Sequence, residues 1–210
     1  LVLKNLLDNG FLDNEKYKNF KKQKISLKKT KKIFLEDSQY YIEDVRKNII
    51  DKLSYEKVYK QGFNINTPID LELQRIATQS LRKGLIEYDK RKGWRGPLLN
   101  KTYKKEWFKD LKNYELEKSI NWKLAIVTKI DKFSADIEMK ENLKGTIDYK
   151  GISWTKKEFN EVLKVGDVIY VKEDSNGKFS LKQIPKINGG IVVMNPYTGR
   201  ILAISGGFSF

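Results

Sequence analysis

The sequence contains no cysteine and no histidine, and only four prolines among its 210 residues. Without thiols and imidazoles there are no disulfides, no Cys/His zinc sites, no thiolate nucleophiles and no Ser-His-Asp triad. No apolar run approaches the roughly eighteen residues that a membrane-spanning helix needs, and no secretory signal pattern is recognisable. Any catalysis by these residues would therefore use Asp, Glu, Lys, Ser or Tyr.

Positive charge is abundant, since 42 basic residues against 27 acidic ones give a net charge of +15. Such a balance is typical of proteins that bind nucleic acid or anionic lipid. However, 36 of the basic residues are lysine and six are arginine, whereas recognition of phosphates and bases relies heavily on arginine. We interpret the excess as compositional bias towards lysine on a solvated surface.

The first twenty residues predict two short helices, the first ended by Asn9-Gly10 and the second capped by Asp13. Residues 16–32 contain nine lysines and no acidic residue. This run is either an arm that lies on anionic lipid or wall polymer or, as we favour, a solvated linker kept open by its own charge.

Two amphipathic helices are predicted next. The first follows Ser38, and the second is capped by Asp70 and ended by Gly93. Between them residues 63–67 alternate as a short strand does, and a further helix is predicted around residues 107–111.

From residue 122 the pattern changes to short strand candidates, at 124–128, 134–139, 143–148, 167–172 and 178–184. A helix is predicted at 156–163, after the third strand, and residues 174–177 (DSNG) form a hairpin signal. Five short strands with a helix after the third predict an OB-type barrel.

The last residues contain two unbroken apolar runs, 191–194 and 201–204, joined by a turn in which Gly199 supplies a positive φ. Such runs are typical of strands buried on both faces. Because a lone two-stranded hairpin cannot cover its own faces, we expect the sheet it joins and the layers that cover it to be residues outside this chain, so that the chain is a truncated piece.

Four segments, in this order, resemble the bifunctional (class A) penicillin-binding proteins, most closely their 1A type. Residues 1–15 are similar to the end of the glycosyltransferase domain, and residues 66–74 (NTPIDLELQ) to a family motif that continues to 94–97 (WRGP). Residues 122–187, with GISW at 151, GDVI at 166 and QIP at 183, resemble the family's OB-like insert. Residues 188–210 (NGGIVVMNPYTGRILAISGGFSF) resemble the opening hairpin of the transpeptidase domain.

The resemblance implies an α+β fold: a helical linker region, a small OB-like five-stranded β-barrel and a terminal β-hairpin from a truncated transpeptidase sheet. It divides the chain into the glycosyltransferase tail with the basic linker (1–35), a helical linker that begins the transpeptidase-associated region (36–120), the OB-like domain (121–187) and the first transpeptidase hairpin (188–210). The residues that carry the resemblance, expected to be structural, are Asp70, Leu73, Gln74, Gly96, Pro97, Trp154, Gly166, Asp167, Gln183, Pro185, Gly189, Asn195, Pro196, Gly199, Gly206 and Gly207.

For function, the resemblance implies a non-catalytic segment of a peptidoglycan synthase that polymerises lipid II and cross-links stem peptides as a serine-type D-Ala-D-Ala transpeptidase. The parent would be anchored in the bacterial inner membrane and face the periplasm, where it acts in cell-wall synthesis and cell shape. The segment would position the two catalytic domains and offer a docking surface for a regulator such as an outer-membrane lipoprotein activator. No catalytic, metal or cofactor residue is expected here, and nucleic acid is not an expected partner.

The catalytic Ser-x-x-Lys motif of the family is expected outside these residues, although the spacing also occurs five times here. A catalytic pair needs the serine at a helix N-terminus in a cleft, with the lysine on the same face. We interpret all five pairs as accidents of a lysine-rich chain, as we do residues 119–121 (SIN). They are Ser26/Lys29, Ser54/Lys57, Ser80/Lys83, Ser153/Lys156 and Ser175/Lys178.

Three alternatives remain open at this level. Asp131, Asp136 and Glu138 would form either a cation site or, as we favour, a solvated loop. The aromatic residues Trp94, Tyr103, Trp107 and Phe108 would stack on sugars or a partner, or pack a helix against the barrel, which we favour. A standalone OB protein that binds single-stranded nucleic acid is the alternative function, and it would need exposed aromatic residues interleaved with basic ones; the barrel's candidates are scattered, at Phe133, Tyr149, Trp154 and Phe179.

Overall fold

The computed structural model describes residues 1–23, 37–104 and 106–210, which fall into two compact units, Leu1–Phe34 and Leu35–Phe210. The first unit contains helices α1 (Val2–Asp8) and α2 (Asn14–Lys22). Gly10 follows α1 with φ of 75°, and the Asp13 carboxylate accepts the backbone N–H of Lys16 at 2.7 Å. Both predicted helices and their end signals are confirmed; most of the lysine-rich run lies outside the described residues.

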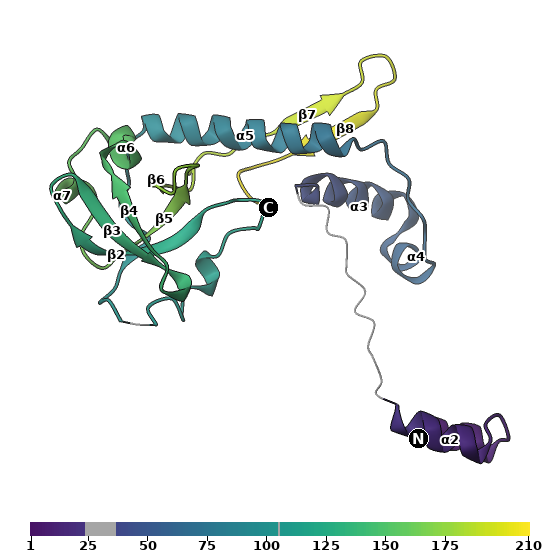
Figure 1. Cartoon of the computed structure of the whole chain (residues 1–210). Helices are drawn as coiled ribbons and strands as arrows, with labels where there is room; N and C mark the ends of the chain where they lie inside the picture. The colour runs from purple at the N-terminus through teal and green to yellow at the C-terminus, as the bar shows by residue number, and fades with distance from the viewer. Residues whose placement is uncertain (24–36, 105) are drawn as a thin grey trace. The chain divides into compact units, whose positions relative to one another are not determined.

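The second unit begins with helices and continues into strands (Figure 1). Its helices are α3 (Gln39–Leu53), α4 (Tyr55–Lys60), α5 (Leu71–Arg91), α6 (Tyr149–Ile152) and α7 (Phe159–Val162), with 3₁₀ turns η1 (Lys112–Tyr114), η2 (Lys140–Asn142) and η3 (Ser153–Thr155). Its strands are β1 (Leu99–Asn100), β2 (Lys123–Ile130), β3 (Ser134–Met139), β4 (Lys144–Asp148), β5 (Asp167–Glu173), β6 (Phe179–Lys182), β7 (Ile191–Met194) and β8 (Ile201–Ser205).

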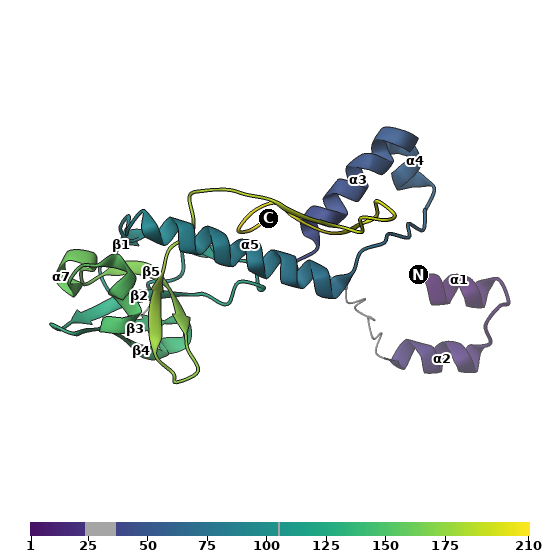
Figure 2. The same ribbon diagram turned by 90° about the horizontal axis from the view of Figure 1, so that it is seen from above.

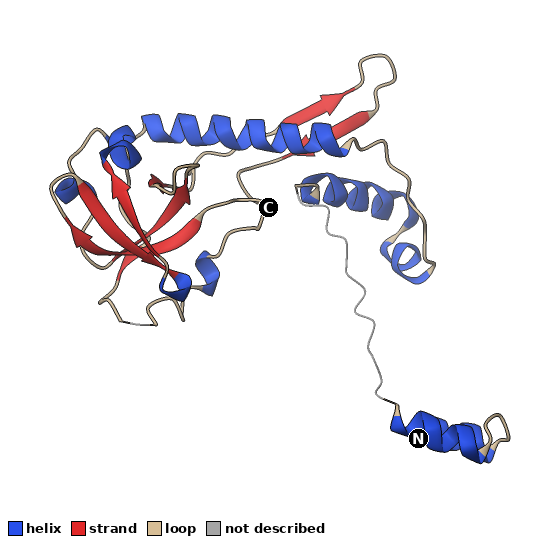
Figure 3. Ribbon diagram, viewed as in Figure 1, coloured by secondary structure: helices blue, strands red, loops and turns tan. Residues whose placement is uncertain are grey.

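Strands β2 to β6 close into a barrel in the order β5-β2-β3-β4-β6, with β6 pairing back onto β5 and the short β1 added along β5. All these pairs are antiparallel except β4–β6, which is parallel. Helices α6 and α7 lie between β4 and β5 in the chain, and Figure 3 shows the strands wrapped around one another. The predicted OB-like five-stranded barrel is confirmed.

The barrel has its own core, because alternate residues of each strand point inwards. Inward side chains of β2, β3 and β5 are at most 4% exposed, and Phe159 and Val162 of α7 close the cluster. A second buried cluster lies outside the barrel wall, where Trp107 and Leu111 cover Leu124, Ile126, Val168 and Tyr170.

Strands β7 and β8 form a separate two-stranded sheet. Ala203 and Ser205 are buried where β8 contacts α5 and α3, whereas Val192 and Met194 of β7 are 60% and 55% exposed. The expectation that every covering layer lies outside the chain is therefore wrong for one face, which α5 and α3 of this chain cover. The partners of the other face stay a prediction.

Two local expectations are also wrong. Residues 63–67 pair with no strand in the described part of the chain, and Phe63 and Ile65 are 42% and 48% exposed. No helix forms at residues 107–111: residues 106–110 are successive turns, and Trp107 and Leu111 are buried in the cluster on the barrel wall. In both places packing, or its absence, overrides the local pattern.

Candidate functional site at the long helix

The long helix α5 runs from the barrel to the hairpin, as the two views at right angles show (Figures 1 and 2). Its N-terminus is fixed by Asp70, whose carboxylate accepts the N–H groups of Glu72 and Leu73 at 2.9 and 3.0 Å. Acidic caps stabilise this end because they satisfy free N–H groups and oppose the helix dipole.

One face of α5 carries three polar side chains that bond to segments far away in sequence. Gln74, Arg82 and Asp89 are spaced by eight and seven residues, which is close to two helical turns each, so they share a face. Gln74 and Asp89 are 1% and 3% exposed, and the Arg82 side chain is 12% exposed. We call these the Gln74, Arg82 and Asp89 joints.

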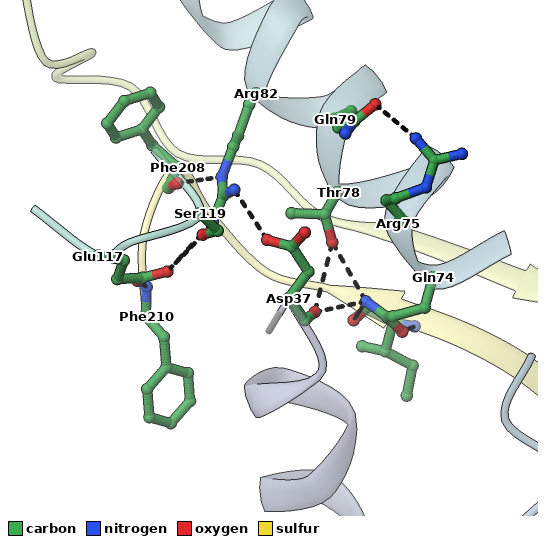
Figure 4. A network of polar contacts seen from close by, with 11 residues as sticks. Asp37, Gln74, Arg75, Thr78, Gln79, Arg82, Glu117, Ser119, Phe208 and Phe210 are labelled. Carbon is green, nitrogen blue, oxygen red and sulfur yellow. Dashed lines mark hydrogen bonds and ion pairs between the residues drawn. The ribbon is translucent and has the colours of Figure 1, made fainter. Parts of the chain in front are cut away.

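At the Gln74 joint a side-chain amide takes the place of a neighbouring strand (Figure 4). Its Nε2 donates to the backbone oxygen of Ile204 in β8 at 2.8 Å, and its Oε1 accepts the N–H of the same residue at 2.9 Å. Nε2 also donates to the Asp37 backbone oxygen at 2.8 Å. A buried amide with both ends satisfied fixes β8 and the start of α3 on the helix.

The Arg82 joint lies between the other two and spreads one guanidinium over three segments (Figure 4). Nη1 donates to the Asp37 carboxylate at 2.8 Å, Nη2 to Glu117 at 3.2 Å and Nε to the Phe208 backbone oxygen at 2.8 Å. Glu117 also accepts the N–H of Phe210. The planar fork of arginine suits such simultaneous contacts.

At the Asp89 joint a buried carboxylate binds the barrel and the segment that leaves it. Asp89 accepts Nη1 of Arg95 and Nε2 of Gln183, each at 2.8 Å, and the N–H of Lys186 at 3.2 Å. Arg95 also donates to the Ile184 backbone oxygen at 2.7 Å. The carboxylate thus joins the end of α5 to both chain segments that flank the barrel.

Burial alone would raise the pKa of Asp89, because it disfavours the charged form. The hydrogen bonds from Arg95, Gln183 and Lys186 outweigh it, so that the pKa lies below the ordinary value of an aspartate. The Asp89 joint is therefore ionised at neutral pH.

Apolar packing fills the space between the joints. Leu85 on α5, Ile120 and Phe208 form a buried cluster, against which Trp122 packs with its ring centroid 5.0 Å from that of Phe208. Gly206 precedes this contact, and a Cβ there would lie 2.7 Å from the ring of Tyr40. That glycine lets the chain pass close to α3.

The structure brings several of the sixteen residues that carry the family resemblance to these joints. Gln74 and Gln183 take part directly, whereas Asp70 caps α5 and Leu73 lies next to Gln74 on that helix. Gly96 and Pro97 follow Arg95, Pro185 is buried after Gln183, and Gly189, Gly206 and Gly207 lie in the segments that run to and from the hairpin.

The remaining residues of that set belong to the barrel and the hairpin turn. Trp154 donates its Nε1 to the Leu181 backbone oxygen at 3.2 Å, and Asp167 accepts from Asn100 at 2.7 Å. Gly166, with φ of 90°, lies where a Cβ would meet the Lys101 backbone oxygen. Asn195, Pro196 and Gly199 form the β7–β8 turn.

The four serine–lysine pairs within the described residues lie on different elements. Ser54 lies between α3 and α4, Ser80 on the exposed side of α5, and Ser175 in the β5–β6 turn. Ser153 donates to the Lys150 backbone oxygen at 2.9 Å. Ser26 and Lys29 lie outside the described residues. Ser119 donates to Glu117 at 3.3 Å.

The three barrel carboxylates have separate partners. Asp131 pairs with Lys129 at 2.9 Å, Asp136 accepts from Thr146 at 3.0 Å, and Glu138 accepts from the Tyr103 hydroxyl at 2.7 Å. In the described residues no group of three metal-ligating side chains is present. Glu138 is only 3% exposed, so the expectation of a solvated loop is wrong for that residue.

Most of the aromatic side chains in the segment 94–108 pack on the barrel. Trp94 donates to the Val162 backbone oxygen at 3.0 Å and makes an edge contact with Trp154, and Trp107 is 3% exposed beside Phe108. They fix loop segments, and not a helix, to the barrel. On the barrel itself Phe179 is buried, whereas Phe133 and Tyr149 are 65% and 51% exposed.

Comparison with known proteins identifies this arrangement. Residues 94–187 match the family model of the penicillin-binding protein OB-like domain. Penicillin-binding protein 1A of Rickettsia prowazekii is 35% identical over an alignment that takes in the whole chain and 27% of that protein. The chain is homologous over its whole length to the class A penicillin-binding proteins of the 1A type.

Penicillin-binding protein 1A of Haemophilus influenzae is 31% identical over the whole chain. Its crystal structure superimposes with a TM-score of 0.70 at 29% identity, covering 99% of this chain and 31% of that one. The chain therefore spans about a quarter of the length of the curated penicillin-binding protein 1A relatives that it matches. The α+β fold with an OB-like barrel and a hairpin is the fold of that structure.

Sequence reasoning missed Asp89 and Arg82 as joint residues. The available signal was their position on the apolar face of α5. Arg82 lies three residues before Leu85, and Asp89 lies four residues after it. A charged residue in such a face requires a partner. The partners lie as far as 126 residues away, so periodicity alone does not reveal them.

Proposed function

We propose that this chain is the non-catalytic inter-domain segment of a bifunctional peptidoglycan synthase and sets the geometry between the sites that polymerise glycan and cross-link peptides. The observation that carries the proposal is α5, which is bonded to the barrel at one end through Asp89 and to the hairpin at the other through Gln74. A single rigid helix with buried bonds at both ends transmits position well.

The hairpin supports the same proposal. The outer edge of β8 is bonded to α5, since Leu202 accepts the Asp70 N–H at 2.9 Å and Ile204 is bonded to Gln74. In the described part of the chain no strand pairs with the outer edge of β7, and its side chains Val192 and Met194 are exposed. We infer that a transpeptidase sheet continues from β7.

The parent activities are part of the proposal: glycosyl transfer from lipid II and serine-type D-Ala-D-Ala transpeptidation, on the periplasmic face of the inner membrane. Among the described residues no helix is long and apolar enough to cross a bilayer. The barrel, which has its own core and projects from one end of α5, would serve as the docking surface for an outer-membrane lipoprotein activator or other cell-wall proteins. No cofactor is proposed for this segment.

The test uses the full-length synthase with Gln74→Ala or Asp89→Asn. We expect cross-linking to fall by about tenfold or more, because small displacements of a reacting group are costly, while glycan polymerisation stays unchanged. Gln79→Ala and Asp110→Asn are matched controls on exposed residues. If both joint variants weaken the fold but leave cross-linking unchanged, the positioning role is wrong.

Two further measurements use the chain itself. Labelled β-lactam should acylate none of its serines, and filter binding of single-stranded DNA at two salt concentrations should show no steep salt dependence. Acylation that disappears in Ser80→Ala would contradict the non-catalytic role. Tight, salt-sensitive DNA binding would favour the nucleic-acid alternative.

A further inference from the structure

Three lysines lie near one another where the end of α5 meets the outer wall of the barrel. In the antiparallel pair β5–β6, Tyr170 lies opposite Lys182 and Lys172 lies opposite Ser180. Lys172 and Lys182 are thus diagonal neighbours on one face of the two strands. That face is the outer one, because Val171 and Leu181 point into the barrel core.

Lys90 reaches the same place from α5. Its Nζ lies 5.7 Å from the centre of the Trp154 ring, and the indole N–H of Trp154 is bonded to the backbone oxygen of Leu181, the residue before Lys182. We call Lys90, Lys172 and Lys182 the lysine cluster.

None of the three ammonium groups has a carboxylate oxygen within 4.0 Å among the described residues. The neighbouring carboxylate of Asp89 is occupied by Arg95 and Gln183, and Glu87, which lies on the same side of α5, is 4.0 Å from Lys83. Like charges without counter-charges repel one another, so the cluster costs folding free energy unless an anion binds.

The pKa of Lys182 is affected by this environment. Burial and then the charges of Lys90 and Lys172 lower its pKa to about 8. A nearby negative charge favours the charged form of a lysine, so an anion that binds beside Lys182 should raise its pKa.

A cleft gives a ligand access to the cluster. Lys90 and Lys172 line a space of about 600 Å³ between α5 and the segment 119–122. Its apolar wall includes Ile86, Trp122 and Phe208, and its other charged lining residues are Arg82, Lys83 and Glu87. Lys182 lines a second space of about 370 Å³ on the side of Trp94 and Tyr170. Trp122 and Phe208 pack on each other, so their rings are not free platforms for stacked bases.

We propose that the lysine cluster is a binding site for a compact oxyanion of the phosphate class, such as pyrophosphate. Lysine ammonium groups bind phosphate as point charges. Lys90 and Lys172 line one space, and Lys182, which lines the next, adds a third positive charge nearby. A long polyanion would need a continuous basic track with free aromatic faces. The proposal does not rest on the proposed function of the parent synthase.

The probe is sodium pyrophosphate, titrated calorimetrically into the chain at low ionic strength. We expect saturable binding that weakens about tenfold in Lys172→Gln, because one charge-assisted contact is lost. Lys90→Gln and Lys182→Gln should weaken it similarly. Lys157→Gln, which removes an exposed barrel lysine outside the cluster, is the matched control. Lys172 is itself exposed, so its variant should keep the fold.

A second readout follows the pKa of Lys182 by NMR, which we expect to rise towards that of an ordinary lysine when pyrophosphate binds. A parallel arm with phosphatidylcholine vesicles, with and without phosphatidic acid, distinguishes free from lipid-borne phosphate. Cluster-dependent binding in either arm supports the site. Equal losses in Lys157→Gln and Lys172→Gln, or no binding in both arms, would overturn it.

Discussion

The two ends of α5 make their connections with different chemistry. At the N-terminal end the neutral amide of Gln74 bonds to the backbone of β8. At the C-terminal end the carboxylate of Asp89 bonds to Arg95 and Gln183, and the lysine cluster lies beside it. Gln74 thus attaches the hairpin through a group that does not titrate, whereas Asp89 attaches the barrel through one that does.

This difference predicts that the two ends respond differently to pH and to truncation of a side chain. The neutral end should depend on geometry alone. The charged end should also depend on the ionisation of Asp89 and Lys182, at acid and alkaline pH respectively.

The largest effect is expected for Asp89→Ala. The change leaves the guanidinium of Arg95 and the amide of Gln183 without their shared acceptor, which should cost about 2–4 kcal/mol of unfolding free energy. Chemical denaturation measures it, with Asp110→Ala as control because that side chain is 89% exposed. If Asp89→Ala cost no more unfolding free energy than Asp110→Ala, the Asp89 contacts would not stabilise the attachment of the barrel to α5.

Gln74→Ala should come next, at about 1–3 kcal/mol, because the N–H and C=O of Ile204 both lose a buried partner. Amide hydrogen exchange at Ile204 should become faster, whereas Gln79→Ala, on the exposed side of the same helix, should leave it unchanged. Unchanged protection of Ile204 in Gln74→Ala would mean that β8 is fixed by other contacts.

Lys182→Met should stabilise the chain at neutral pH by about 1–2 kcal/mol, a figure reduced because the side chain is only partly buried. Its folded pKa of about 8 lies below the unfolded value, so the unfolded chain binds more protons between them. Stability should therefore rise from about pH 8 to pH 10.5 in the native chain. The variant should lack this contribution, and equal slopes in the two proteins would contradict the low pKa.

The smallest effect is expected in acid. The pKa of Asp89 is lowered in the folded chain, so its contribution is complete above the ordinary aspartate pKa of about 4 and is lost as the pH falls through the folded value. Asp89→Asn should flatten this part of the stability profile, and Gln74→Ala should not. A profile flattened equally by both would show that the ends do not differ.

Much of the fold could be predicted because its signals are local. The caps Asp13 and Asp70, the turns at Gly177 and Gly199 and the alternating barrel strands are each encoded within a few neighbouring residues. The family motif also singled out Gln74 and Gln183, although not their roles.

What could not be predicted depends on distant contacts. Gln183 meets Asp89 across 94 residues, and Gln74 meets Ile204 across 130. Residues 106–110 form turns and no helix because Trp107 packs in the cluster on the barrel wall. The periodicity of α5 predicts an apolar face but does not reveal that this face covers β8. Domain boundaries within 36–210 stay predictions.

The amide of Gln74 also determines in which direction the small sheet can grow. Because it satisfies the donor and the acceptor of Ile204, and Asp70 takes the oxygen of Leu202, the β8 border offers no template for a foreign strand. Any strand that is added must therefore pair with β7. A one-residue slip of β8 would break both hydrogen bonds between the Gln74 side chain and Ile204. One glutamine thus determines which edge of the hairpin can pair with a further strand, and it fixes the register of β8 against α5.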